Sequence, residues 1–282
     1  MGSPSALYPK KIDLTNCDKE PIHLIGRIQS HAMLFVIDNP SFEISHISEN
    51  VISTLSRKRE DFFSKRLKDV LGENGTLIET YIKSGDNNSL EVTINDNRYV
   101  VVTHHNNQLV YIELEPIEQQ ENAQFMQRQL SEIISDLSEA VSVSAMCDKT
   151  AQLIKQFAGY DRVMIYKFDE NWNGKIVSEA REEQLDSWIG MHYPATDIPQ
   201  QARKLFLKQG VRIIADVASQ TVPVYTKLTL QDEPLDLGLC ESRASSPIHI
   251  EYLQNMKVGA TLTAAIVSDG ELWGLIACHH YS

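Results

Sequence analysis

Short apolar runs separated by polar turns dominate the first part of the chain, and this pattern predicts strands rather than long helices. The run from Met33 to Asp38 is apolar up to its last residue and predicts a buried strand, and the Asn39-Pro40 pair after it predicts a turn. A second strand is expected over Phe42 to Ile47. Apolar positions interspersed with charged ones predict short helices over residues 50–71.

Three further strands are expected before residue 117, over Leu90–Ile94, Tyr99–Thr103 and Leu109–Leu114. Asn-rich segments at 95–97 and 106–107 separate them and predict hairpin turns. Two strands, small helices and then three antiparallel strands is the order found in PAS domains. We therefore expect residues 1–117 to form an extended arm, over about the first 20 residues, followed by a PAS domain.

The stretch from 118 to 158 has a helical pattern, because its apolar residues recur at spacings of three and four. These residues are Phe125, Met126, Leu130, Ile133, Ile134, Leu137 and Val141. Such a stripe packs either on the helix's own domain or against a second copy in a homodimer. The two arrangements are compatible.

Strands and helices alternate in the rest of the chain. Strands are expected over Arg162–Phe168, Lys175–Ala180, Val211–Val217, Ala260–Ser268 and Leu272–His279, and helices over Ile198–Gln209 and Ser246–Val258. This order fits a GAF domain, which we expect over residues 118–282 with its leading helix. The predicted fold class is α+β, with a PAS domain and a GAF domain that each hold a central antiparallel sheet and flanking helices.

Composition narrows the classes of function. A chain of 282 residues with 42% hydrophobic and 23% charged residues is typical of a globular protein of two domains. A formal net charge of −12 argues against nucleic acid as a partner. No apolar run reaches the roughly 20 residues that span a bilayer, and no leader peptide opens the chain. We expect a cytoplasmic protein with no membrane partner.

The four cysteines argue against a zinc site and against a disulfide framework. Cys17, Cys147, Cys240 and Cys278 are far apart and form no CxxC pair, so reduced thiols are expected. The run Cys278-His279-His280 could indicate metal binding. Adjacent strand residues point to opposite faces, however, and two ligands on one face do not make a structural site. We expect no metal.

Two helix starts carry candidate chemistry. Ser246 is suited to an N-cap and Pro247 to the first helical position, and His249 and Tyr252 then share one face with Met256. On this otherwise apolar face we expect His249 and Tyr252 to form a buried polar pair, which must find partners. A single histidine on such a face is most often a structural residue with satisfied hydrogen bonds. Asp197, taken alone, is an ordinary N-cap of the helix that follows Pro199.

Four segments, in order along the chain, carry a resemblance to a known family. They are Cys17 to Gln29, Tyr193-Pro-Ala-Thr-Asp-Ile-Pro199, Arg243 to Met256 (with Ser246-Pro-Ile-His249) and Leu272 to His280. Together they resemble the bacteriophytochromes, which hold biliverdin through an N-terminal cysteine. The resemblance covers nearly the whole chain. It implies a red and far-red photoreceptor module, not an enzyme, in which biliverdin IXα isomerises from Z to E at its D ring.

The resemblance also implies a role for each matching residue. Asp197 accepts from the pyrrole N–H groups through its carbonyl, His249 lies over the pyrrole rings, and His279 bonds the D-ring carbonyl. The residues expected at the propionates are Arg212, Arg243, Ser246, Thr261 and Thr263. The other residues expected around the pigment are Met164, Tyr166, Trp188, Tyr193, Ile198, Pro199, Phe206 and Tyr252.

Cys17 is the expected attachment thiol. The position before His249, where other phytochromes carry their thiol, is Ile248 here, which cannot attach a pigment. A thiolate at Cys17 is expected to form a thioether with the A-ring side chain of biliverdin. The resemblance further implies a figure-of-eight knot between the arm and the GAF domain, an exception to the rarity of knots.

Two departures from the family matter. Phe206 stands where relatives often have tyrosine, so one hydroxyl is missing near the propionates. The chain ends at Ser282 with no PHY or output domain, so we expect incomplete photoconversion and possible fluorescence, in a natural fragment or an engineered near-infrared fluorescent protein.

Two other functions remain open from the residues. Tyr166 to Glu170 is faintly similar to a motif of cyclic-nucleotide-binding GAF regulators, and a PAS/GAF chain could also be a plain dimerisation scaffold. Neither gives a reason for Cys17, Asp197, His249 and His279 to occur together.

Overall fold

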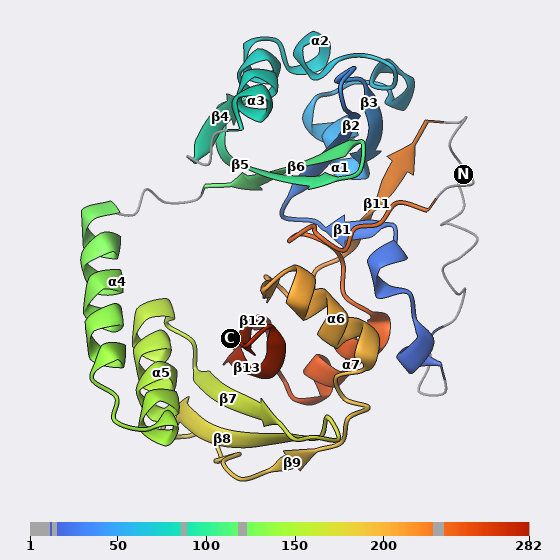
Figure 1. Ribbon diagram of the computed structural model, residues 1–282. Coiled ribbons are helices and arrows are strands. Elements are labelled where there is room, and N and C mark those ends of the chain that lie inside the picture. The colour runs from blue at the N-terminus through green and yellow to red at the C-terminus, as the bar shows by residue number, and fades with distance from the viewer. Residues whose placement is uncertain (1–11, 13–15, 86–88, 118–122, 228–233, 282) are drawn as a thin grey trace. The chain divides into compact units, whose positions relative to one another are not determined.

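The computed structural model describes residues 12, 16–85, 89–117, 123–227 and 234–281, which form two compact units (Figure 1). Described residues within 21–119 and 219–244 make up the first unit, and those within 11–20, 120–218 and 245–281 make up the second. A single boundary near residue 117 would place residues 11–20 in the first domain and residues 219–244 in the second. The two compact units have these segments the other way round. The predicted domain boundary and the predicted knot both stay predictions.

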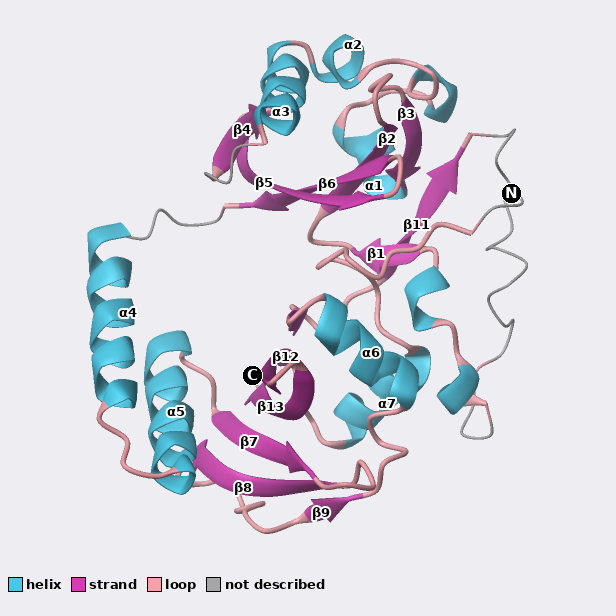
Figure 2. Ribbon diagram, in the orientation of Figure 1, coloured by secondary structure: helices cyan, strands magenta, loops and turns pink. Residues whose placement is uncertain are grey.

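The described residues of the first unit form one seven-stranded antiparallel sheet in the order β1-β11-β3-β2-β6-β5-β4 (Figure 2). Its strands are β1 (Arg27–Gln29), β2 (Met33–Asp38), β3 (Ile44–Ser48), β4 (Leu90–Ile94), β5 (Asn97–Asn106), β6 (Leu109–Pro116) and β11 (Thr221–Thr226). Its helices are α1 (Glu49–Thr54), α2 (Leu67–Leu71), α3 (Glu73–Ser84) and the short 3-10 helices η2 (Ile22–Leu24) and η3 (Arg59–Asp61).

Sequence patterns located some of these elements and missed others. β2 and β4 have the predicted bounds, but β3 begins at Ile44 rather than at Phe42, whose φ of 63° places it in a turn. Helix α3 was not expected. Strand β11 was not expected either, because Pro223 within its run lacks the N–H that a strand uses for pairing.

Residues 219–244 are anchored to the first unit by a strand and by a buried carboxylate. β11 lies between β1 and β3 in the sheet. Farther along, the fully buried Glu113 on β6 accepts hydrogen bonds from the backbone N–H groups of Glu241 (3.0 Å) and Ser242 (2.8 Å) and from the Ser242 hydroxyl. Burial alone would raise the pKa of Glu113, but the hydrogen bonds from His104, Ser242 and the backbone hold it below its usual value.

The described residues of the second unit form a six-stranded antiparallel sheet in the order β10-β12-β13-β7-β8-β9. Its strands are β7 (Arg162–Phe168), β8 (Gly174–Arg181), β9 (His192–Tyr193), β10 (Val211–Ile214), β12 (Ala260–Ser268) and β13 (Glu271–His280). Its helices are η1 (Cys17–Lys19), α4 (Ala123–Ser138), α5 (Val143–Ala158), α6 (Gln200–Lys208) and α7 (Pro247–Asn255).

The helices of this unit differ from expectation in two places. The stretch predicted as helical over 118–158 contains two helices, and the second begins where Ser142 accepts a hydrogen bond from the Ala145 N–H (3.1 Å). Helix α6 has Pro199 at its N-cap with no side-chain cap, so the reading of Asp197 as an N-cap is wrong. The side chain of Asp197 is thereby left for another role.

The two faces of the second sheet have different neighbours. One face packs Val163, Ile165 and Cys278 against Cys147 and Ala151 of α5, which lies along β7 and β8 in Figure 1. Side chains alternate between faces along a strand, so the residues between these positions point to the opposite side. That opposite face carries the candidate site.

Glu113→Gln is expected to loosen the segment 219–244. The substitution removes the charge that the N–H groups of Glu241 and Ser242 bind, and charge-assisted bonds of this kind contribute about 1–3 kcal/mol to stability. We expect a loss of that size in urea unfolding at pH 7 and faster amide exchange at both residues. Because the pKa of Glu113 is depressed, the contribution is present at pH 7 and is lost as the pH falls through that pKa.

Glu115→Gln is the matched control. Burial, followed by repulsion from Glu113, raises the pKa of Glu115 to about 7, so its charge does not stabilise the fold. We expect this neutral substitution to leave stability unchanged or slightly higher at pH 7. Equal losses for the two variants would contradict the anchoring role of Glu113.

Candidate functional site

The strand register brings predicted site residues from four strands to one face of the second sheet. Thr261, His279 and Arg162 are direct neighbours in one row across β12, β13 and β7. The row two residues away holds Arg212, Thr263, Ala277 and Met164. Directly opposed residues of antiparallel strands point to the same side. The register therefore places Thr261 and Thr263 on one face, and His279 on the face opposite to Cys278.

Most of the expected pocket residues contact one another on this face. They belong to one apolar cluster that contains Met164, Tyr166, Trp188, Tyr193, Ile198 and Phe206. The rings of Tyr166 and Tyr193 lie 5.9 Å apart between centroids, and Trp188 lies 5.9 Å from His279. Residues spread over more than 40 positions of sequence are thus gathered beside β7 and β13.

His249 and Tyr252 of α7 lie near this face, and we use the word hollow for the region that they share with Asp197 and Tyr166. The rings of His249 and Tyr252 stack with centroids 6.3 Å apart, and both side chains are exposed to solvent, so the expectation of a buried pair is wrong. Burial, followed by the charge of Arg212, nevertheless lowers the pKa of His249 to about 4, and burial raises the pKa of Tyr252 to about 12.

Asp197 belongs to the same group. Its side chain is exposed, yet burial raises its pKa, and its charge in turn acts on Tyr166, Tyr193 and Tyr252. These electrostatic effects require short distances. Asp197 therefore faces the same hollow as the three tyrosines.

Two buried polar atoms of the site find no hydrogen-bond partner among the described residues: the Tyr166 hydroxyl and Nδ1 of His279. Burial, then the nearby charge of Arg162, lowers the pKa of His279 to about 4, so its ring is neutral at pH 7. Buried polar groups in native proteins are nearly always paired with protein, water or ligand. The Tyr166 hydroxyl and His279 Nδ1 are therefore available for hydrogen bonds to a bound polar molecule.

Polar groups suited to carboxylates lie at the β10 side of the hollow. Arg212 donates from Nη2 to the Ser245 hydroxyl (3.1 Å) and pairs across the strands with Thr263. Ser246 stands at the N-cap of α7 but does not cap it with its side chain. Arg243 belongs to the first unit, where its Nη1 donates to the Ile22 carbonyl (3.1 Å), so the structure does not group it with the other site residues.

The arm that carries Cys17 belongs to the second unit. Cys17 is the first residue of η1, and η1 packs against α6, which directly follows Pro199. The side chain of Cys17 lies outside the described part of the structure.

Sequence reasoning missed a buried ion pair beside the site. Arg162 pairs with Glu179, lies 4.0 Å above the ring of Trp188 and donates to the Asp186 carbonyl (2.8 Å). Glu179 accepts from the Trp188 N–H (3.1 Å), so the pair holds the Trp188 loop against the sheet. The sequence did contain a signal for this pair. Arg162 and Glu179 are charged residues on inward-facing positions of two predicted strands, and buried charges require partners.

Arg203 on α6 was also missed. Its Nη1 donates to the Ile198 carbonyl (2.6 Å), and its guanidinium lies 4.6 Å from the ring of Trp172. Arg203 thereby holds the turn that presents Asp197. No motif in the sequence marked this residue.

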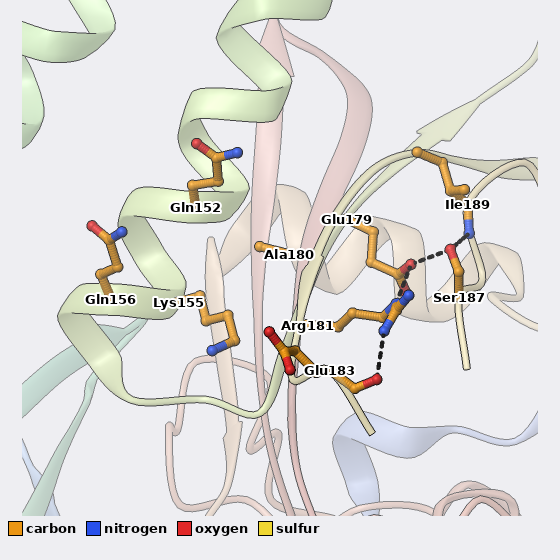
Figure 3. Close-up of a pocket in the computed structure, with 9 residues that line it drawn as sticks. All are labelled: Gln152, Lys155, Gln156, Glu179, Ala180, Arg181, Glu183, Ser187 and Ile189. Carbon is orange, nitrogen blue, oxygen red and sulfur yellow. Dashed lines mark hydrogen bonds and ion pairs between the residues drawn. The ribbon is translucent and has the colours of Figure 1, made fainter. Parts of the chain in front are cut away.

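A different hollow, of about 540 Å³, opens between α5 and β8 (Figure 3). Its lining residues are Gln152, Lys155, Gln156, Glu179, Ala180, Arg181, Glu183, Ser187 and Ile189. None of them is a predicted site residue. Two of its cations are engaged, since Lys155 pairs with Glu182 and Arg181 donates to the Glu182 carbonyl (3.1 Å). Glu179 is shared with the ion pair to Arg162 beside the site.

The described residues hold no group of three or more His, Cys, Asp or Glu side chains placed to bind a metal. Cys147, Cys240 and Cys278 are buried free thiols. Within the described ranges, no helix is both long enough and apolar enough to cross a membrane.

Two family models match the chain. One described as a PAS fold matches residues 17–117, and one described as a GAF domain matches residues 142–282. The predicted α+β fold, with PAS before GAF, is therefore confirmed.

Phytochromes are among the similar proteins. Cyanobacterial phytochrome B of Nostoc sp. is 38% identical over 97% of this chain and 38% of its own length. A bacteriophytochrome of Xanthomonas campestris pv. campestris is 36% identical over 96% of this chain and 44% of its own length. The chain thus spans less than half of the length of these curated relatives.

Solved structures match over most of their own length. The chromophore-binding domain of Stigmatella aurantiaca phytochrome P1 superposes with a TM-score of 0.86 at 33% identity, over 95% of this chain and 91% of that one. The corresponding domain of an unusual bacteriophytochrome from R. palustris superposes with a TM-score of 0.85 at 30% identity, over 94% and 90%.

Gly174→Ala is expected to displace Tyr166. A Cβ at Gly174 would lie 1.6 Å from Cζ of Tyr166 and 1.9 Å from its hydroxyl, so the phenol occupies the space that the missing side chain leaves. Forcing the ring away costs about 1–3 kcal/mol of stability, as for other overpacked cores. Urea unfolding measures that loss, and in a Tyr166→Ala background it should largely disappear.

Gly210→Ala is the control, because a Cβ there meets nothing within 4 Å. This substitution should not lower the free energy of unfolding. It should raise it slightly, because alanine restricts the unfolded chain more than glycine does. If both alanine variants lost the same stability, the close contact between Gly174 and Tyr166 would be refuted.

Proposed function

This chain belongs to the bacteriophytochromes of the phytochrome family, and we propose that it binds biliverdin IXα and acts as a red and far-red light-sensing module. The observation that carries the proposal is the set of polar groups gathered beside one face of the second sheet. His249, Tyr252 and Asp197 are exposed there with pKa values shifted by burial, and among the described residues the buried Tyr166 hydroxyl and His279 Nδ1 find no hydrogen-bond partner. A planar ligand with pyrrole N–H groups and carbonyl oxygens matches these atoms.

Each polar residue has a role that follows from its protonation. The pKa of His279 and that of His249 are both lowered to about 4, so at pH 7 each neutral imidazole can donate one hydrogen bond and accept another. His279 donates to the D-ring carbonyl, and the Asp197 carbonyl accepts from the pyrrole N–H groups. When bound, biliverdin supplies light absorption and Z-to-E isomerisation of its D ring.

The propionates of biliverdin go to the polar edge of the hollow. Arg212 carries a guanidinium there, whose fork suits a carboxylate, and Thr261 and Thr263 add hydroxyls on the same face. Ser246 completes the proposed set. Phe206 contributes apolar contact but no hydroxyl.

Attachment occurs at Cys17. Its thiolate adds to the A-ring vinyl group: the sulfur–carbon bond forms as the vinyl π bond breaks, and the other vinyl carbon takes up a proton. The addition consumes no oxidant or reductant. Its support is the place of η1 in the second unit, packed against α6 beside the Asp197 turn.

The molecule also forms a homodimer through α4 and α5. The described apolar residues exposed on and between these helices are Leu130, Ile134, Val141, Val143 and Met146. Exposed apolar side chains gathered on neighbouring elements mark a protein interface more often than isolated ones do.

Mixing the apoprotein with biliverdin should give red absorption, and the denatured product should fluoresce as a band on zinc-stained gels. Cys17→Ser should lose the band, because serine cannot form the thioether, while it keeps red absorption from the non-covalent complex. Cys147→Ser is the control thiol and should behave as the wild type.

Two other outcomes of the gel and absorption measurements would contradict the proposal in whole or in part. Neither band nor absorption from the wild type would overturn the proposal and favour a cyclic-nucleotide ligand, which nucleotide binding to the same protein would reveal. A band that survives in Cys17→Ser would show that another thiol is attached.

Ile134→Glu should convert the dimer to a monomer in sedimentation equilibrium, because it places a charge on a side chain that is 66% exposed here and buried in the proposed interface. Leu77→Glu on α3, at a side chain that is 51% exposed, is the matched control and should remain dimeric. A wild-type monomer would refute the dimer.

A further inference from the structure

Glu20 is the last residue of the arm that belongs to the second unit, because Pro21 begins the part that belongs to the first. Its side chain is 2% exposed, although glutamate is rarely buried without a partner. The residue therefore lies at the point where the chain passes from one unit to the other, with its carboxyl group inside the second.

The buried carboxyl group is tied to the start of α7. The Ser246 hydroxyl donates to Oε2 of Glu20 at 2.5 Å. Ser246 is the N-cap residue of α7, but its side chain makes no capping bond to the helix backbone. A hydroxyl that usually caps a helix is used here to hold a distant segment, 226 positions away in sequence.

This bond limits where Cys17 can be. Glu20 is three positions after Cys17, and even a fully extended chain of that length covers only about 10 Å. The turn is tighter than that, since the Lys19 N–H bonds the Asn16 carbonyl (3.0 Å) and η1 is a 3-10 helix. Fixing Glu20 on Ser246 therefore keeps the Cys17 backbone close to the helix that presents His249.

We propose that Glu20 is a positioning residue for pigment attachment: its bond to Ser246 holds the backbone of the arm at Cys17 near the start of α7. This inference rests on the proposed function. Glu20 touches neither the thiol nor the pigment in this role. It raises the local concentration of the thiol at the A ring and so accelerates thioether formation without adding to pigment affinity.

The test separates attachment from binding. Attachment rates at saturating biliverdin come from zinc-stained gels over time, and non-covalent affinity comes from absorption titration in a Cys17→Ser background. Glu20→Ala should slow attachment about tenfold or more, the size expected when one hydrogen bond to a charged group is lost. Its affinity in the Cys17→Ser background should stay within about twofold of the parent, since Glu20 contacts Ser246 and not the pigment, and Ser246 itself is unchanged.

Two further variants test whether the bond between Glu20 and Ser246 is responsible for the change in rate. Ser246→Ala should slow attachment too, and combining it with Glu20→Ala should slow it no further, because one bond has been removed in both. Glu20→Gln, which keeps the shape and can still accept from Ser246, should recover part of the rate and covers the case in which the alanine variant fails to fold. Glu251→Ala, an exposed carboxylate on α7, is the control and should attach at the wild-type rate.

The outcomes that would refute the role of Glu20 differ from the outcome that would refute the proposed function. Wild-type attachment by Glu20→Ala would overturn this inference and leave the proposed function intact. An affinity that falls in step with the rate would also overturn it, because Glu20 would then contribute to the pigment pocket. A wild-type protein that binds no biliverdin would refute the proposed function itself.

Discussion

The alternation of side chains along β7, β12 and β13 is the constraint on which the second unit depends. A strand directs successive residues to opposite faces, so Val163, Ile165 and Cys278 pack on α5 while their neighbours point to the hollow. A slip of one residue in the register would exchange core and site together. The apolar packing on α5 therefore fixes the positions of the functional residues on the other face.

The hollow gathers polar groups that the protein leaves uncharged or unpaired. Two imidazoles have lowered pKa values, Asp197 has a raised one, and two buried polar atoms have no partner among the described residues. Such an arrangement is costly in an empty protein, because water is only partly able to satisfy it. A bound pigment would form hydrogen bonds with these groups and so remove part of that energetic cost.

Local patterns predicted much of this architecture. Short apolar runs located β2, β4 and β7 to the residue, and the sequence motifs led to side chains that meet on one sheet face. What they could not show depends on distant partners. β11 contains Pro223 and becomes a strand only between β1 and β3, and the Arg162–Glu179 pair exists only after two strands align. The bond from Ser246 to Glu20 replaces a cap that local sequence predicted.

The placement of β11 has a consequence for how the chain folds during synthesis. Within the described part of the first sheet, β11 is the one strand that pairs with β1, so Arg27 to Gln29 have no strand partner until residues 221–223 have left the ribosome. By then β2 to β6 and most of the following unit have already emerged. Nascent chains in between would expose the edge of β3, the kind of unpaired edge that recruits chaperones or aggregates. Translation speed across residues 117–226 is therefore a variable in the yield of native protein.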